Sequence, residues 1–141
     1  MKISGNIVKN FSLSEMACND SARTLVITPE LVKHAQNLQK FREWYNKPMH
    51  VNSWYRTPEY NKQVGGATKS QHLNGMATDI ALPSDFNSMT ATRKKEWMNN
   101  MKSKWHSICN GGGGFGIYDT FIHVDSRATK TDFDYRKNKN Y

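Results

Sequence analysis

The sequence predicts an α+β fold in which several helices pack against a small antiparallel sheet. Helix-start signals and helical spacing of apolar residues dominate the first part of the chain, and short strand-like segments dominate the last part. Helices followed by mainly antiparallel strands are typical of an α+β domain. A length of 141 residues suits one such domain with a single core.

Two helices are expected near the start of the chain. Ser12 or Ser14 can cap a short helix through Met16. A stronger start is Thr28-Pro29-Glu30, which combines an N-cap, a proline at the first helical position and an acidic first turn. Pro48 limits the end of the helix that follows. The apolar residues of this second helix have helical spacing: Leu31, Ala35, Leu38, Phe41 and Tyr45.

The middle of the chain alternates strands and helices. Met49–Trp54 is predicted to be a strand. Thr57-Pro58-Glu59 starts another short helix by the same cap-and-proline pattern, and Gly65-Gly66 ends it with a turn. Met76–Leu82 has the composition of a buried strand, and a further helix is expected from about Thr90 to Trp105.

A glycine-rich hairpin follows. Gly111–Gly114 predicts a loop or bulge. The strands Phe115–Tyr118 and Phe121–Ser126 come next, around a turn at Asp119-Thr120. These last strands complete the expected sheet.

The charge balance is strongly basic, with 20 Lys and Arg against 12 Asp and Glu, a formal charge of +8. Such an excess favours an anionic partner, either nucleic acid, an acidic membrane surface or a cell-wall polymer, or it serves solubility alone. The basic residues are scattered, and only Arg136, Lys137 and Lys139 cluster, which disfavours nucleic acid. We expect one domain over residues 1–141, with a core from about 11 to 133 and this basic tail.

The cysteines and the N-terminus indicate little about export. Cys18 and Cys109 form no metal-binding C-x-x-C pair, and two buried thiols are favoured over one disulfide. Met1–Phe11 lacks the apolar run of a secretory signal, and no run approaches the roughly 18 apolar residues of a membrane span. We therefore expect synthesis in the cytoplasm, no transmembrane segment, and another route for any action outside the cell.

A first segment with metal-ligand chemistry is Ser70-Gln71-His72-Leu73-Asn74-Gly75-Met76-Ala77-Thr78-Asp79. His72 and Asp79 stand seven residues apart, and Gly75 allows the chain to turn between them. Asp79 lies in the predicted buried strand, where a carboxylate is costly unless a partner or a metal compensates it.

A second such segment is Phe121-Ile122-His123-Val124-Asp125, in which His123 and Asp125 share one face of a strand. If the two strands are close, His72, Asp79 and His123 converge. Two imidazoles and one carboxylate suit zinc and leave a fourth position for water. The other interpretation is three unrelated polar residues: a capping histidine, a salt-bridged aspartate and a satisfied strand histidine.

The pattern S-x-H-x-x-G-x-A-x-D, followed by an H-x-D strand, resembles the zinc D-alanyl-D-alanine carboxypeptidase family. That family includes phage cell-wall endopeptidases and vancomycin-resistance dipeptidases, and it shares its fold with the hedgehog signalling domain. Its small phage and prophage members resemble this chain also at Phe11–Met16 and Val51–Asn61. The similarity covers about residues 11–127. It implies one zinc ion per chain, held by His72, Asp79 and His123.

The resemblance also implies substrate contacts. The family places an arginine near the substrate carbonyl, and Arg56 matches it as the candidate to stabilise the oxyanion. Its alternative role is a surface arginine, or one paired with Glu59. Ser70 is a candidate substrate-binding residue, or it simply begins the turn before His72.

The residue that transfers protons is less well defined. Relatives often carry an acid three positions before the last histidine, where this chain has Thr120. Asp125 is the first candidate base because it shares a face with His123. Its rival role is to orient a ligand histidine, and Asp119 on the hairpin turn is a further option.

The resemblance thus implies a zinc peptidase that cuts peptide bonds of bacterial peptidoglycan. We expect a monomer, phage or prophage encoded, that reaches the wall after lysis or within a virion. The alternative is a catalytically weak, zinc-bearing wall-binding or virion structural module, which the missing acid at Thr120 favours. Nucleic-acid binding rests on charge alone, without a recognisable motif, and is not expected.

Overall fold

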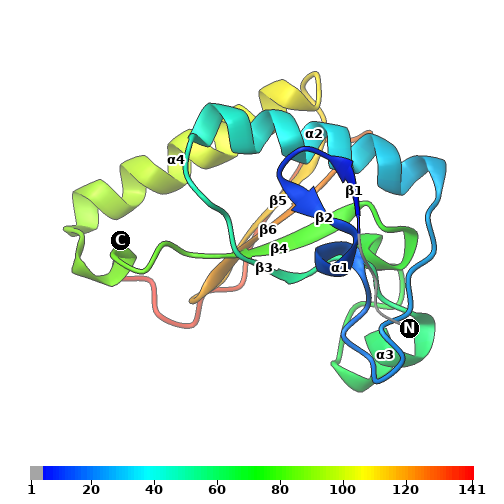
Figure 1. Ribbon diagram of the computed structural model, residues 1–141. Helices are drawn as coiled ribbons and strands as arrows, with labels where there is room; N and C mark the ends of the chain where they lie inside the picture. The colour runs from blue at the N-terminus through cyan, green and yellow to red at the C-terminus, as the bar shows by residue number, and fades with distance from the viewer. Residues whose placement is uncertain (1–4) are drawn as a thin grey trace.

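The computed structural model describes residues 5–141. The predicted lack of a secretory signal in Met1–Phe11 therefore concerns a segment that lies partly outside the described residues. Within residues 5–141, no helix is both long enough and apolar enough to cross a membrane. The described residues form two layers, a five-stranded sheet and the helices α2 (Pro29–Tyr45) and α4 (Ala91–Ile108), which together cover one face of it (Figure 1).

The strand order in this sheet is β3-β4-β6-β5-β7. The pairings of β4 with β6 and of β5 with β6 are antiparallel, as is that of β3 with β4. The four strands predicted from the sequence are present, and the α+β class is confirmed. The strands are β3 (Val51–Ser53), β4 (Ala77–Ala81), β5 (Gly114–Ile117), β6 (Phe121–Asp125) and β7 (Thr131–Asp134).

The prediction of an antiparallel sheet is wrong for one pair, since β7 runs parallel to β5. After β6 the chain passes the end of β5 and returns on its far side. The connection from β5 to β7 contains all of β6, so it has the length of about a dozen residues that a parallel pair requires. The sequence predicts that the core ends at about residue 133, where the basic tail begins. Residues around this boundary instead form the edge strand β7.

The predicted helices begin at the residues that can cap them. Ser12 caps α1 (Leu13–Met16) through a capping box. The hydroxyls of Thr28 and Thr57 accept hydrogen bonds from backbone N–H groups in the first turns of α2 and of α3 (Pro58–Gln63). The remaining elements are short: β1 (Asn6–Val8), β2 (Phe11–Ser12), η1 (Gln71–Asn74) and η2 (Phe86–Ser88).

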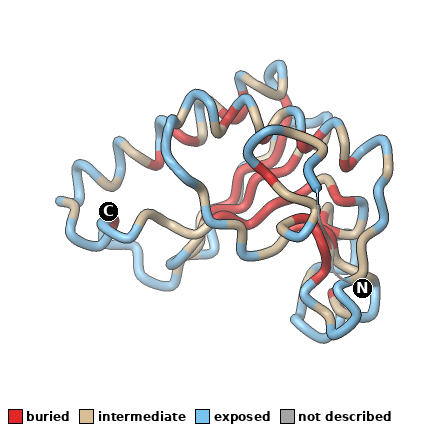
Figure 2. The backbone as a smooth tube through the Cα atoms, viewed as in Figure 1, coloured by how far each residue is buried: buried red, intermediate tan, exposed pale blue. Residues whose placement is uncertain are grey.

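The core lies between the sheet and the two long helices (Figure 2). Because side chains alternate along β6, Ile122 and Val124 point into this core, whereas His123 and Asp125 point to the opposite face. The side chains that the core buries completely include Leu31, Leu38, Phe41, Trp54, Trp105 and Phe115. The polar residues of the sheet thus gather on the face that the long helices leave uncovered.

Candidate metal centre

Strand pairing brings two of the predicted ligands together. Asp79 of β4 and His123 of β6 are direct partners across the antiparallel ladder, so their side chains lie on the same face. His72 reaches the same place from η1, just before β4. That helix ends at Gly75, whose left-handed backbone (φ 73°) and lack of a Cβ let the chain turn tightly against Leu31.

The three side chains converge on one point. His72 Nε2 and His123 Nδ1 lie 3.2 and 3.0 Å from Asp79 Oδ1. One ligand atom from each residue lies within 4.8 Å of the other two. All three residues are buried, with 2%, 6% and 7% exposure for His72, Asp79 and His123. The interpretation as three unrelated polar residues does not describe this arrangement.

In each histidine, the ring nitrogen that points away from Asp79 determines whether the other nitrogen carries a lone pair. His72 Nδ1 lies 2.6 Å from the backbone oxygen of Trp54, which can only accept, so Nδ1 carries the hydrogen and Nε2 keeps a lone pair. His123 Nε2 lies 2.8 Å from a carboxylate oxygen of Asp125 and donates to it, which leaves a lone pair on Nδ1. Three acceptor atoms therefore meet in a group that could hold a metal ion, and either a metal ion or a proton between them would offset their mutual repulsion.

The pKa shifts of the three residues show how the cluster handles a positive charge. Burial alone would raise the pKa of Asp79, but the histidines beside it hold that pKa below its usual value. Burial lowers the pKa of His72. Burial also opposes protonation of His123, yet its hydrogen bonds to Asp125 and Asp79 raise its pKa overall. A metal ion bound here would take the place of a proton that His123 otherwise attracts.

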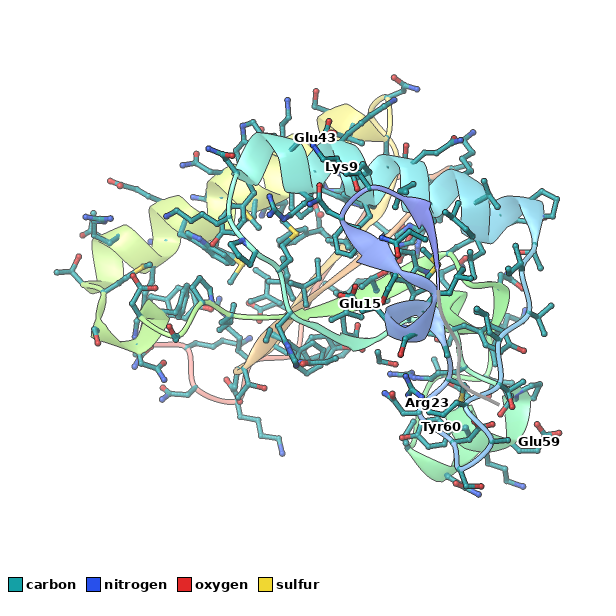
Figure 3. The ribbon with its side chains drawn as sticks, in the orientation of Figure 1. Lys9, Glu15, Arg23, Glu43, Glu59 and Tyr60 are labelled. Carbon is teal, nitrogen blue, oxygen red and sulfur yellow. The ribbon has the colours of Figure 1, made fainter. Side chains whose placement is uncertain are left out.

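Arg56 borders the cluster and does not pair with Glu59. Its Nη2 donates to Asp79 Oδ2 at 3.2 Å, and its Nε and Nη1 donate to Ser53 and Asn61. Glu59 lies on the outer side of α3 (Figure 3). The Arg56 guanidinium is thus held beside a predicted metal ligand.

A cleft of about 250 Å³ opens next to this cluster, lined by Asn19, Asn52, Ser53, Arg56, Tyr60, Val64, Asp79 and Phe121. A larger cavity of about 410 Å³ lies between α4 and β7 and is lined in part by Lys95, Lys102 and Arg136. None of the three converging ligands lines the larger cavity. The smaller cleft is therefore the candidate substrate site, because Asp79 of the cluster lines it.

Asp125 lies on the expected face, but its carboxylate is fully engaged. It accepts four hydrogen bonds: one from His123 Nε2, and three from the backbone N–H, Nε and Nη2 of Arg127. A carboxylate has about four lone-pair positions. With 0% exposure and no free acceptor position, Asp125 is better arranged to orient His123 than to take a proton from water.

The other candidates near the site have local partners. Ser70 caps η1, and its hydroxyl accepts from the His72 backbone N–H at 3.2 Å, which fits the turn-starting role. Asp119 is exposed on the hairpin turn and accepts from the backbone N–H groups of Lys137 and Asn138. Ser70 therefore adjoins a ligand, whereas Asp119 is tied to the C-terminal segment.

The remaining histidines and both cysteines lie outside the cluster. His34 is a core residue that bonds to Thr78 and Ser126, and burial lowers its pKa to about 3. His106 bridges Gly112 and Asp132 on the other face of the sheet. His50 is exposed. Cys18 and Cys109 are both free thiols, but only Cys18 is buried, so the prediction of two buried thiols is wrong for Cys109, which is partly exposed.

Sequence reasoning missed Arg127. The signal that could have found it is its position two residues after Asp125, since alternate residues of an extended chain share a face. Its Nε and Nη2 lie 2.8 and 2.7 Å from the two oxygens of Asp125, which forms a bidentate pair.

A protein-family model matches this chain. The family model of peptidase M15 matches residues 9–125, which is most of the chain. The match contains His72, Asp79 and His123, and Arg127 lies just beyond its end. A search of curated proteins found no match.

Proposed function

The chain belongs to the peptidase M15 family of zinc metallopeptidases, and from this premise we propose that it hydrolyses peptide stems or cross-bridges of bacterial peptidoglycan. The observation that carries the proposal is the convergence of two imidazole lone pairs and one carboxylate beside a cleft. We assign His72, Asp79 and His123 as the ligands of one zinc ion per chain.

The donor set fits zinc, because two neutral imidazoles and a carboxylate with an open fourth position are typical of catalytic zinc sites. When bound, the ion would polarise the scissile carbonyl and lower the pKa of a water molecule to about 7. The Trp54 carbonyl and Asp125 hold the two rings with their lone pairs inward. These contacts organise the ligands before the metal arrives.

Arg56 is the proposed oxyanion-stabilising residue. Its guanidinium lines the cleft beside Asp79 and is held there by Ser53 and Asn61. A preorganised cation at this place would favour the negative charge that develops on the carbonyl oxygen. Ser70, directly before the ligand segment, remains a candidate substrate contact.

For Asp125 we propose the orienting role, because all its acceptor positions are filled by His123 and Arg127. Proton transfer then falls to another group, and Asp119 is the next candidate because its carboxylate is on an exposed turn. A phage or prophage origin, a monomeric state and action at the wall after lysis or within a virion belong to the same proposal.

A second candidate function is a zinc-bearing wall-binding or virion module with weak catalysis. Two observations favour it: Thr120 stands where relatives often have an acid, and Asp125 has no free acceptor position. Turbidity loss of purified cell walls, with and without a chelator, separates the two functions. The peptidase predicts clearing that the chelator abolishes. Sedimentation with the walls without clearing would contradict the peptidase and favour the binding module.

A further inference from the structure

Arg127 donates two side-chain hydrogen bonds to Asp125, the carboxylate that accepts a hydrogen bond from His123. Its guanidinium lies in a fork over both oxygens of Asp125, and its side chain is 29% exposed while that of Asp125 is not exposed at all. The ion pair also raises the pKa of the Arg127 guanidinium above its usual value. The fork therefore closes the outer side of a buried carboxylate whose inner side faces a predicted ligand.

Two glycines of β5 leave the space that this arrangement fills. A Cβ at Gly114 would overlap the Asp125 carboxylate, and one at Gly116 would overlap the ring of Phe133. Phe133 lies between the two ends of the contact, with its ring centroid 5.3 Å from that of His123 and 6.0 Å from Arg127 Cζ. The glycines of β5 thus make room for a ring of contacts from His123 to Asp125, Arg127, Phe133 and back to His123.

We propose that Arg127 is a positioning residue of the metal centre. It fixes the Asp125 carboxylate in the orientation that accepts the His123 Nε2–H, and this keeps the Nδ1 lone pair directed at the metal. The inference rests on the proposed function in one respect, that His123 is a ligand. Arg127 itself touches neither ligand atom nor cleft.

The physical reason is the geometry of the fork. Without the Arg127 side chain, the Asp125 carboxylate keeps only the hydrogen bonds from His123 Nε2 and from the backbone N–H of residue 127, so it can rotate more readily about its Cβ–Cγ bond. A buried carboxylate that loses a charged partner is also strongly disfavoured. Two parallel N–H donors in the plane of the carboxylate prevent that rotation. Lysine keeps the charge but has no planar fork, so it restores the charge without the orientation. His72 needs no such support, because a backbone carbonyl fixes its ring.

The chain supplies a matched control. Arg136 pairs with Asp134 through the same two side-chain atoms, at 2.9 and 2.7 Å, but no histidine bonds to Asp134. Arg136→Met therefore removes a bridge of the same geometry, together with the contacts of Arg136 to Tyr141, without touching the centre.

The test measures zinc affinity, by competition with a chromophoric chelator at neutral pH, in the wild type, Arg127→Met, Arg127→Lys and Arg136→Met. We expect about 10-fold weaker binding for Arg127→Met, at the low end of the range for residues that orient a ligand. Arg127→Lys should be intermediate, and Arg136→Met should match the wild type. Thermal unfolding reports which variants are folded, and Arg127→Lys carries the comparison if Arg127→Met does not fold.

A double-mutant cycle with Asp125→Asn decides whether Arg127 acts through Asp125. We expect Arg127→Met to change zinc affinity much less in the Asp125→Asn background than in the wild type. Wild-type affinity in both folded Arg127 variants, or an equal loss in both backgrounds, overturns the inference. Wild-type protein that binds zinc but leaves walls intact overturns the proposed activity alone. Wild-type protein that binds no zinc overturns both.

Discussion

Two aspartate–arginine bridges with nearly the same local geometry lie at different places in this sheet. In Asp125–Arg127 and Asp134–Arg136, the Nε–Oδ1 distances are 2.8 and 2.9 Å, and the Nη2–Oδ2 distance is 2.7 Å in both. The first aspartate is completely buried and also accepts from His123, whereas the second has a side chain 33% exposed at the edge strand. The Asp-x-Arg spacing produces the bridge, and its position in the sheet determines what the bridge can do.

This comparison explains why the same three-residue pattern predicts different consequences. At the edge, solvent screens the pair, and its loss should cost little. Beside His123, the carboxylate transmits the pairing to a predicted metal ligand. Substitutions in the buried bridge should therefore lower both stability and zinc binding, whereas substitutions in the edge bridge should change stability only slightly and leave zinc binding unchanged.

The largest expected effect is at the ligand that the buried bridge supports. His123→Ala removes one of three ligands, so hydrolysis of purified walls should fall to the level of chelator-treated wild type. Arg136→Met at the edge should keep wild-type activity. Initial rates of turbidity loss provide the measurement. A His123→Ala protein that still clears walls at more than about a tenth of the normal rate would remove His123 from the catalytic centre.

Arg56 differs from Arg127 and Arg136 because it lines the cleft, so its substitution should affect catalysis directly. Arg56→Lys should lower turnover by about 100-fold, as loss of a comparable oxyanion donor does. Zinc content and folding should be retained, since Arg56 is not a ligand. Steady-state rates and zinc analysis on the same sample provide the check. Normal turnover in Arg56→Lys would show that Arg56 does not stabilise the oxyanion.

The two aspartates test the comparison directly. Asp125→Asn should weaken zinc binding by about 10–100-fold, with activity largely restored at saturating zinc. Asp134→Asn should leave zinc binding unchanged. Wall hydrolysis measured across a zinc titration separates the orienting role from the catalytic one. A rate that stays about 10²–10⁴-fold low at saturating zinc would show that Asp125 is the general base instead.

The smallest effect concerns the stability contributed by the edge bridge. Hydrogen bonds from Arg136 lower the pKa of Asp134 to about 2 from its ordinary 3.8. Since the folded-state pKa is the lower one, the bridge stabilises the fold above about pH 4, and this contribution is lost as the pH falls toward 2. Because the pair is partly exposed, it is worth about 0.5 kcal/mol.

Urea unfolding of wild type and Asp134→Asn provides the measurement for this bridge. The difference in unfolding free energy should be present at about pH 6 and smaller at about pH 3. A difference that does not change with pH would mean that the charge of Asp134 does not contribute.

Much of the site could be predicted from the sequence because it depends on regular geometry. Strand alternation placed His123 and Asp125 on one face, and the ladder then made Asp79 the neighbour of His123. The helix starts at Thr28 and Thr57 followed from their side-chain caps. The assignment of His72, Asp79 and His123 as zinc ligands stays a prediction, although the structure brings them together.

Other features depend on contacts that local patterns do not contain. The orientation of the Asp125 carboxylate is decided by Arg127, whose partner is apparent only once the chain is folded. The parallel pairing of β7 with β5 depends on the path taken after β6. Its short alternating segment, Thr131–Asp134, carries too few apolar residues to predict a strand by itself.

The most direct test of the metal centre is the zinc content of purified wild type and Asp79→Ala, measured by elemental analysis at neutral pH. Asp79 is the residue that both histidines approach, so its loss should remove the ion. We predict one zinc per chain in the wild type and almost none in Asp79→Ala, with Asp134→Asn as a control that keeps its zinc. Full zinc content in a folded Asp79→Ala protein would contradict the assignment of the site.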